Sequence, residues 1–115
     1  ISEKKLSLKK MSFPTKTGYS IKEMNEIIYA KSESNYTLFH LKDGEKILAT
    51  KTLLYYDQIL EEFGFFRIHQ SYLINLNYLL KFDSENLQVQ VFENELLPVS
   101  IRRKSALMER IKGVF

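Results

Sequence analysis

The chain has 115 residues, of which 44% are hydrophobic and 13% aromatic, so it has the length of one domain and enough apolar side chains for a core. It contains no cysteine, which excludes disulfides, zinc–cysteine sites and thiol nucleophiles. It also shows no signal peptide and no apolar run near the ~20 residues that cross a bilayer. We therefore expect a cytoplasmic protein without a membrane partner.

The net charge of +3 is small, but basic residues gather at the two ends of the chain. Residues 1–16 carry five lysines against one glutamate, and residues 101–112 carry three arginines and two lysines against one glutamate. Each of these segments has a net charge of +4, and the middle of the chain is acidic. Two basic ends can form a footprint for a polyanion. The alternative is that these side chains belong to solvated tails.

The first half of the chain predicts short strands separated by turns. Residues 1–19 are expected to form a basic arm or edge strand, with Pro14 near its end and a turn at Gly18. A helical turn over residues 22–25 and a strand over residues 27–31 follow. The polar stretch SESN, residues 32–35, predicts a loop. The alternation in YTLFHL predicts a strand, and the dipeptide DG after it predicts a hairpin turn towards KILAT.

A change to helical periodicity marks residues 53–62 as a helix of about three turns. Thr52 can cap its start, and Gly64 can end it in the left-handed conformation. The expected buried stripe consists of Leu53, Leu54, Leu60 and Phe63.

The stretch FFRIHQSYLIN, residues 65–75, interrupts an apolar run with His69, Gln70 and Ser71. On one continuous strand, Gln70 would point to the apolar face. Burial of an unpaired amide costs about 1–3 kcal/mol. We therefore predict two strands joined by a bend at these three residues.

The remaining residues predict a hairpin around residues 83–86, an extended segment LLPVS, and a short helix within IRRKSALMERIK. Most of the predicted elements are strands, so the expected fold is mainly β, with one small central helix and a short C-terminal helix. We see no internal repeat and no low-complexity tract.

Three polar connections adjoin predicted strands: SESN, HQS and SIRRK. Arginine reads guanine edges, asparagine and glutamine read adenine, and serine and histidine bind either bases or phosphates. If the three connections lie on one edge of the domain, they form a surface that can bind nucleic acid. Their spacing in the sequence does not show whether they converge.

Three blocks of the chain resemble LytTR-type (LytR/AlgR family) DNA-binding domains of bacterial response regulators. FFRIHQSYLINLNYL is similar to the signature F-x-R-x-H-R-S-[YF]-[LIV]-[VI]-N, EIIYAKSESNYTLFHLKDGE to the family's first block, and LLPVSIRRKSALMERI to its L-P-V-S-R closing motif. The resemblance covers about residues 20–112. Gln70 stands where the family usually has arginine, and Lys31 where it usually has glutamate.

This resemblance implies an elongated β-β-β arrangement of short antiparallel sheets, with residues 20–115 as the DNA-binding domain. It implies sequence-specific binding of double-stranded DNA by loops inserted into successive grooves. The chain would be the output domain of a two-component transcriptional regulator, preceded by a receiver domain, and would bind paired direct-repeat sites as a homodimer. The residues implied in DNA binding are Ser32, Ser34, Asn35, His69, Gln70, Ser100, Arg102 and Arg103.

Individual residues in this set have structural alternatives. His69 is expected to support the bend, which leaves Gln70 as the DNA contact. Asn35 alone fits an ordinary turn residue as well as a DNA contact. Cations at a helix N-terminus are unfavourable, so Arg102 and Arg103 favour a functional purpose for at least one of them.

Other function classes make different demands on the chain. A single-stranded nucleic-acid module needs tyrosine and phenylalanine on a solvated sheet face, and a protein-interaction module needs an exposed strand edge. Two separated histidines, no cysteine, no glycine-rich phosphate loop and no suitably spaced carboxylate pair argue against an enzyme. We therefore expect no catalytic residue, no metal and no cofactor.

Overall fold

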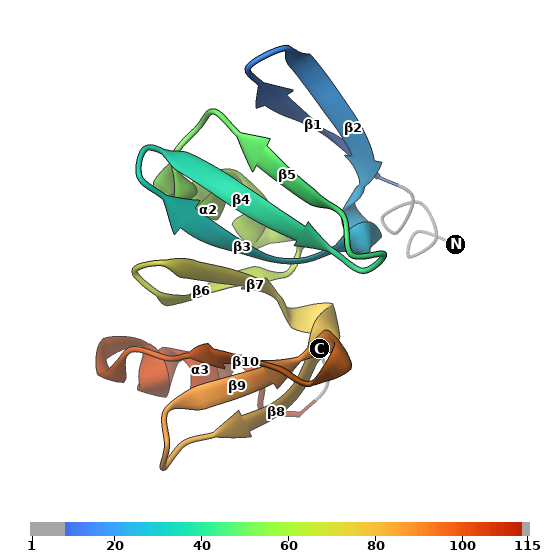
Figure 1. Ribbon diagram of the computed structural model, residues 1–115. Coiled ribbons are helices and arrows are strands. Elements are labelled where there is room, and N and C mark those ends of the chain that lie inside the picture. Colours follow the sequence, from blue (N-terminus) through green and yellow to red (C-terminus); the bar gives the residue numbers. More distant parts are fainter. Residues whose placement is uncertain (1–8, 114–115) are drawn as a thin grey trace.

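Three antiparallel sheets and two short α-helices make up the part of the chain that the computed structural model describes, residues 9–113 (Figure 1). The expected mainly β class is confirmed. The two-stranded sheet lies at one end of the molecule, the five-stranded sheet in the middle and the three-stranded sheet at the other end. Together they form a body that measures 42 × 39 × 25 Å.

The elements follow one another with short connections. The two-stranded sheet contains β1 (Lys10–Thr15) and β2 (Gly18–Glu23). The five-stranded sheet has the order β5-β4-β3-β7-β6, with β3 (Ile27–Glu33), β4 (Tyr36–Leu41), β5 (Lys46–Ala49), β6 (Phe65–His69) and β7 (Tyr72–Asn75). The three-stranded sheet has the order β10-β9-β8, with β8 (Leu79–Asp83), β9 (Gln88–Val91) and β10 (Glu95–Pro98). The helices are α2 (Leu53–Leu60) and α3 (Lys104–Arg110).

The β1–β2 hairpin joins the N-terminal segment to the rest of the fold. Residues 1–8 of the predicted basic arm lie outside the described residues. Alternate residues of β1 point inward, and Met11 and Phe13 are buried in the same cluster as residues of β3 to β5. Strand β1 pairs with β2 from Lys10 opposite Glu23 to Thr15 opposite Gly18. This hairpin therefore contains residues on both sides of the boundary expected between residues 19 and 20.

The predicted loop over residues 32–35 is wrong for its first half. Ser32 and Glu33 belong to β3 and pair with Thr37 and Tyr36, so the connection is a two-residue turn. Ser34 allows this tight turn because its φ of 55° lies in the left-handed region. A polar composition marks a turn region without showing where the backbone pairing ends.

The predicted helix over residues 53–62 is confirmed, but its α-helical part, α2, ends at Leu60. Its N-terminus is capped by Thr52, whose Oγ1 accepts a hydrogen bond from the Tyr55 backbone N at 3.3 Å. A 3-10 turn over Glu61–Phe63 follows the α-helix, and Gly64 ends it with a φ of 88°.

The buried stripe of α2 differs from the predicted one. The buried residues are Leu53, Tyr56 and Leu60, whereas Leu54 is 58% exposed. The spacing of three and four residues between the buried positions places them on one helix face, and residue 54 is rotated about 100° away from residue 53. The prediction for Leu54 was wrong because hydrophobicity was given more weight than the helical period.

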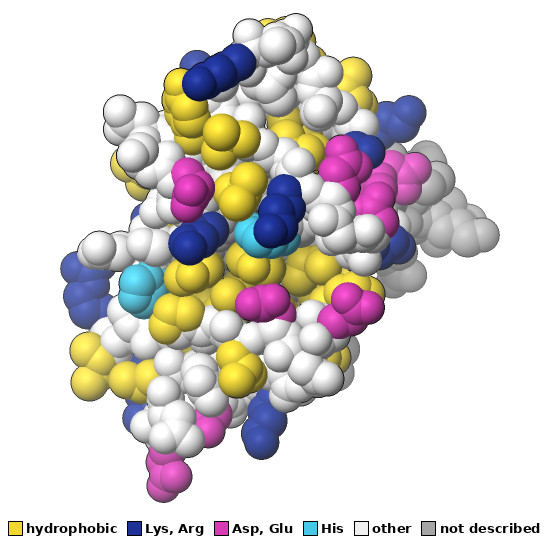
Figure 2. All heavy atoms as spheres, in the orientation of Figure 1, with side chains coloured by type: hydrophobic (Ala, Val, Ile, Leu, Met, Phe, Trp, Pro, Cys, Tyr) yellow, Lys and Arg dark blue, Asp and Glu magenta, His cyan; other side chains and the backbone are white. Residues whose placement is uncertain are grey.

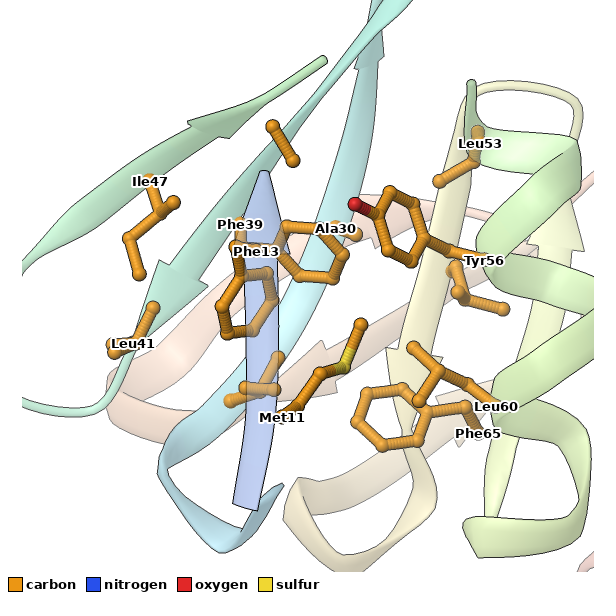
Figure 3. Close-up of a cluster of buried hydrophobic side chains, with 13 residues drawn as sticks. Met11, Phe13, Ala30, Phe39, Leu41, Ile47, Leu53, Tyr56, Leu60 and Phe65 are labelled. Atoms are coloured by element: carbon orange, nitrogen blue, oxygen red, sulfur yellow. The ribbon is translucent and has the colours of Figure 1, made fainter. Parts of the chain in front are cut away.

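Two hydrophobic cores lie on the two faces of the five-stranded sheet. One face packs against β1 and α2 through a cluster that includes Phe13, Phe39, Tyr56 and Phe65 (Figure 3). The other face packs against the three-stranded sheet and α3, and this cluster includes Leu107. Burial on both sides fixes the register of the central sheet, because a shift by one residue would exchange its two faces.

Candidate functional site

The three polar connections lie on the same side of the molecule (Figure 1). Strands β3 and β7 are antiparallel with Lys31 opposite Tyr72, so the end of β3 lies beside the start of β7. This pairing brings the turn at Ser34 and Asn35 next to the β6–β7 turn. A backbone hydrogen bond from Ser32 N to Ser71 O, 3.0 Å long, continues the contact beyond the ladder.

The third connection is bonded to the outer edge of the same sheet. The backbone N of Ser100 donates to the carbonyl oxygen of Ile68 on β6 at 2.9 Å. The side chain of Arg103 donates through Nε to the carbonyl oxygen of Arg67 at 2.8 Å. Residues 100–103 therefore lie beside the end of β6, next to the β6–β7 turn, and the three connections form one row.

Arg67 holds the β6–β7 turn in place. Its Nε donates to the carbonyl oxygen of His69 at 2.9 Å, and its Nη2 donates to the carbonyl oxygen of Gln70 at 2.6 Å. Nη1 lies 3.4 Å from Oδ2 of Asp57 on α2. The planar guanidinium group can make all three contacts at once because its donors point in fixed, diverging directions. The pairing of β6 with β7 shifts register between Arg67 and His69, so the guanidinium spans a bulge.

His69 supports the turn through its ring. Its Nδ1 accepts a hydrogen bond from the backbone N of Ser71 at 3.0 Å, and the ring meets that of Tyr72 edge to face. The side chain is half-buried, whereas Gln70 is exposed at the tip. Gln70 and Ser71 form the turn between β6 and β7, as the misfit of Gln70 predicted, whereas His69 is the last residue of β6 and pairs with Tyr72.

The two arginines of the third connection have different environments. Arg103 is half-buried, and its guanidinium carbon lies 4.8 Å from the centre of the Phe66 ring. Together with its hydrogen bond to Arg67, this contact makes Arg103 an anchor of the connection. Arg102 is exposed in the 3-10 turn Ile101–Arg103 that leads into α3. Its guanidinium group therefore faces solvent.

The first connection presents Ser34 and Asn35, which are both exposed. Ser32 is half-buried on β3, one residue after Lys31, whose Nζ lies 5.9 Å from the centre of the Tyr72 ring. The lysine that replaces the usual glutamate therefore packs towards the second connection. Serine, asparagine and glutamine side chains on this edge can donate and accept hydrogen bonds.

The structure adds Arg67 and Asp57 to the residues that build the site. Neither was among the predicted residues, although Arg67 falls on the polar face of its strand and inside the signature motif. The motif was the signal that could have identified it. Asp57 carried no such signal, because its contact with Arg67 depends on how α2 packs against β6.

Several acidic side chains lie at the ends of the central strands that are opposite the three connections. Asp43 and Glu45 lie on the β4–β5 turn together with Lys42, at the strand ends opposite the three connections, and Glu45 is paired with Lys22. Further acidic side chains lie on that side of the face shown in Figure 2. Burial, followed by the charges of Lys46 and Lys31, lowers the pKa of His40, which stacks on Tyr29 with ring centres 4.2 Å apart. His40 is therefore a packed, neutral side chain at pH 7 and lies apart from the three connections.

Within the described part of the chain, no helix has the length and apolar composition needed to cross a bilayer. Comparison with family models matches residues 19–112 to the LytTr DNA-binding domain. None of the curated proteins compared with the chain matches it.

A solved structure with the same fold is the LytTr DNA-binding domain of a protein from Bacillus cereus assigned as a methyl-accepting/DNA response regulator. The two structures superpose with a TM-score of 0.71 at 17% sequence identity, over 91% of this chain and 97% of the other. At this identity the likeness concerns the fold.

Proposed function

Because the chain belongs to the LytTr DNA-binding domain family, we propose that it binds double-stranded DNA sequence-specifically through the edge that carries its three polar connections. DNA binding follows from the family. The observation that supports this edge as the reading surface is the convergence of three connections that are far apart in the sequence. Hydrogen bonds from Ser32 to Ser71, from Ser100 to Ile68 and from Arg103 to Arg67 hold them in one row.

Within this row, exposure and existing contacts suggest a division of roles. Asn35, Gln70 and Arg102 are exposed and are our proposed base contacts, because amide and guanidinium groups pair with base edges in two places at once. Ser34 and Ser100 are proposed to bind phosphates or nearby base edges. Ser32, His69 and Arg103 already pack or bond within the protein, and we propose that they position the connections.

A duplex fits this surface better than a single strand does. Sequence-tolerant binding of single strands uses exposed aromatic rings as stacking platforms. In this fold Phe39, Phe65 and Phe66 are buried, and Tyr36 and Tyr72 are half-buried. The exposed rings among the described residues, Tyr19 on β2 and Tyr55 on α2, lie outside the three connections. The groups exposed at the turns are instead hydrogen-bonding side chains, which suit the edges of paired bases.

The role in a longer protein is part of the proposal. We infer that the chain is the output domain of a bacterial two-component regulator in the cytoplasm, preceded by a receiver domain. The similar domain from Bacillus cereus supports this inference, since it comes from a protein assigned as a response regulator. We further propose that two copies bind paired direct-repeat sites as a homodimer.

The experiment that tests the proposed function is selection of enriched sequences from a random duplex pool at near-physiological salt. We expect a short motif, and we expect Gln70→Ala and Arg102→Ala each to reduce discrimination by about 1–3 kcal/mol at one position of that motif. Gln58→Ala on α2 and Lys42→Ala on the β4–β5 turn are matched controls, since both side chains are exposed outside the three connections.

Two results would contradict the proposal. The first is a pool without enrichment, combined with weak binding that disappears as salt rises, which would leave only unspecific attraction by basic residues. The second is an enriched motif that is read equally well by all four variants, which would place the reading surface elsewhere.

A further inference from the structure

Two lysines outside the three connections are held over tyrosine rings on neighbouring segments. Nζ of Lys16, in the β1–β2 turn, lies 5.5 Å from the centre of the Tyr36 ring. Nζ of Lys51, between β5 and α2, lies 5.5 Å from the centre of the Tyr55 ring. Both lysines are exposed, and neither forms an ion pair within residues 9–113.

Backbone contacts bring these two segments to the first connection. The carbonyl oxygen of Pro14 accepts hydrogen bonds from Thr50 N at 2.8 Å and from Thr50 Oγ1 at 3.3 Å. The carbonyl oxygen of Lys51 accepts one from Thr37 Oγ1 at 2.8 Å. Thr37 is buried at the start of β4, so the segment that carries Lys51 is bonded close to the Ser34–Asn35 turn.

Tyr36, whose ring lies under the ammonium group of Lys16, is the first residue of β4 and precedes Thr37. Tyr36 follows Asn35 directly, so an ammonium group over its ring lies close to the side chains of the first connection. A ring face attracts a cation and restricts the long lysine side chain, yet it leaves the ammonium donors free for another partner. Glu33 pairs with Tyr36 across the hairpin but forms no ion pair with Lys16 or Lys51 in the described residues.

We propose that Lys16 and Lys51 form a fourth contact region that binds phosphate groups of the DNA backbone next to the groove read by the first connection. This inference rests on the proposed function, because it takes its orientation from the DNA-reading edge. Ammonium groups bind phosphates as point charges and carry no sequence information. The fourth region would therefore add affinity and length to the footprint without changing the motif.

The test is the salt dependence of binding by Lys16→Gln/Lys51→Gln, measured on a duplex with long flanks. Glutamine removes each charge and keeps a long polar side chain. We expect the slope of log K against log salt to become less steep by about 1.8, because each phosphate contact contributes about 0.9. The control is Lys42→Gln/Lys46→Gln, which removes the same charge. These two exposed lysines lie at the β4–β5 turn, at the ends of the strands opposite the three connections.

An unchanged slope in Lys16→Gln/Lys51→Gln, or an equal change in the control, would overturn the inference. An altered motif in the same variant would also contradict it, since phosphate contacts do not read bases. The proposed function fails separately, if the wild-type protein selects no motif. The slope comparison can then still be made on any duplex that the protein binds, and complete lack of DNA binding would overturn both proposals.

Discussion

Tyr56 and Tyr78 place the same phenol group in two different environments. Tyr56 is 1% exposed, and its hydroxyl oxygen is buried without a hydrogen-bond partner among the described residues. Figure 3 shows this hydroxyl among the side chains of the first core, beside Phe39 and Ala30. Burial raises the pKa of Tyr56 to about 12, so the group stays protonated near neutral pH. The hydroxyl of Tyr78, in contrast, donates to the carbonyl oxygen of Asn25.

We expect Tyr56→Phe to leave the free energy of unfolding unchanged or to increase it, because it removes a buried polar atom that has no partner. Tyr78→Phe should lower it by about 0.5–1.5 kcal/mol, because it removes a hydrogen bond. Urea unfolding of both variants beside the wild type measures the difference. A loss in Tyr56→Phe as large as that in Tyr78→Phe would mean that the buried hydroxyl contributes to stability.

The sequence predicted single residues best where one local rule determines their place. Thr52 as the helix cap and Gly64 as the helix end follow from the φ values and hydrogen bonds that a helix terminus requires. The buried place of Tyr56 was not predicted, because burial of one helix face depends on the sheet that packs against it. Leu54 was expected inside because its hydrophobicity was given more weight than the helical period, and it lies outside.

The β6–β7 hairpin is the element in which fold and proposed function depend most on one side chain. Arg67 reaches two carbonyl oxygens of the turn and a carboxylate of α2. Its own carbonyl oxygen accepts the hydrogen bond from Arg103. A change in the Arg67 side chain should therefore affect the second and third connections together.

Arg67→Lys keeps the charge but replaces the planar group with a single ammonium group that cannot span all three acceptors. We expect faster amide hydrogen exchange at Ser71 and a loss of about 1–3 kcal/mol in the free energy of unfolding. DNA affinity should fall as well, because Gln70 is no longer held. Arg110→Lys is the matched control, since Arg110 contacts the Phe66 ring at 5.8 Å. Equal effects of both substitutions would show that Arg67 has no special role in the turn.

The sequence predicted most of the helices and strands, but fewer of the residues at which they begin and end. The bend at His69–Ser71 could be predicted because Gln70 conflicted with an apolar strand face. The end of β3 could not be predicted from SESN, because Ser32 and Glu33 pair through their backbones whatever their side chains are. Short 3-10 turns such as Ile101–Arg103 carry no periodic pattern and become visible only in the fold.

The convergence of the three connections is a property of the whole molecule. It depends on the pairing of β3 with β7, which joins residues more than 40 positions apart, and on the contact of residue 100 with β6. No local pattern predicts such pairings, so the sequence supplied the polar connections and the family resemblance supplied their expected arrangement. The structure then places them on one edge, away from the β4–β5 turn.

The most direct test of that edge as the DNA-binding surface is cleavage of bound duplex by an iron chelate attached to single cysteines. The chain has no cysteine of its own, so each introduced thiol can be labelled alone. Glu33→Cys marks the first connection and Ser105→Cys marks the third, while Lys42→Cys on the opposite edge serves as the control; all three positions are exposed.

We expect the chelates at residues 33 and 105 to cut the duplex at two separate places, on either side of the position that Gln70 reads. The chelate at residue 42 should cut no more than free reagent does. Strong cleavage from residue 42, or identical cleavage patterns from residues 33 and 105, would contradict the placement of DNA along this edge.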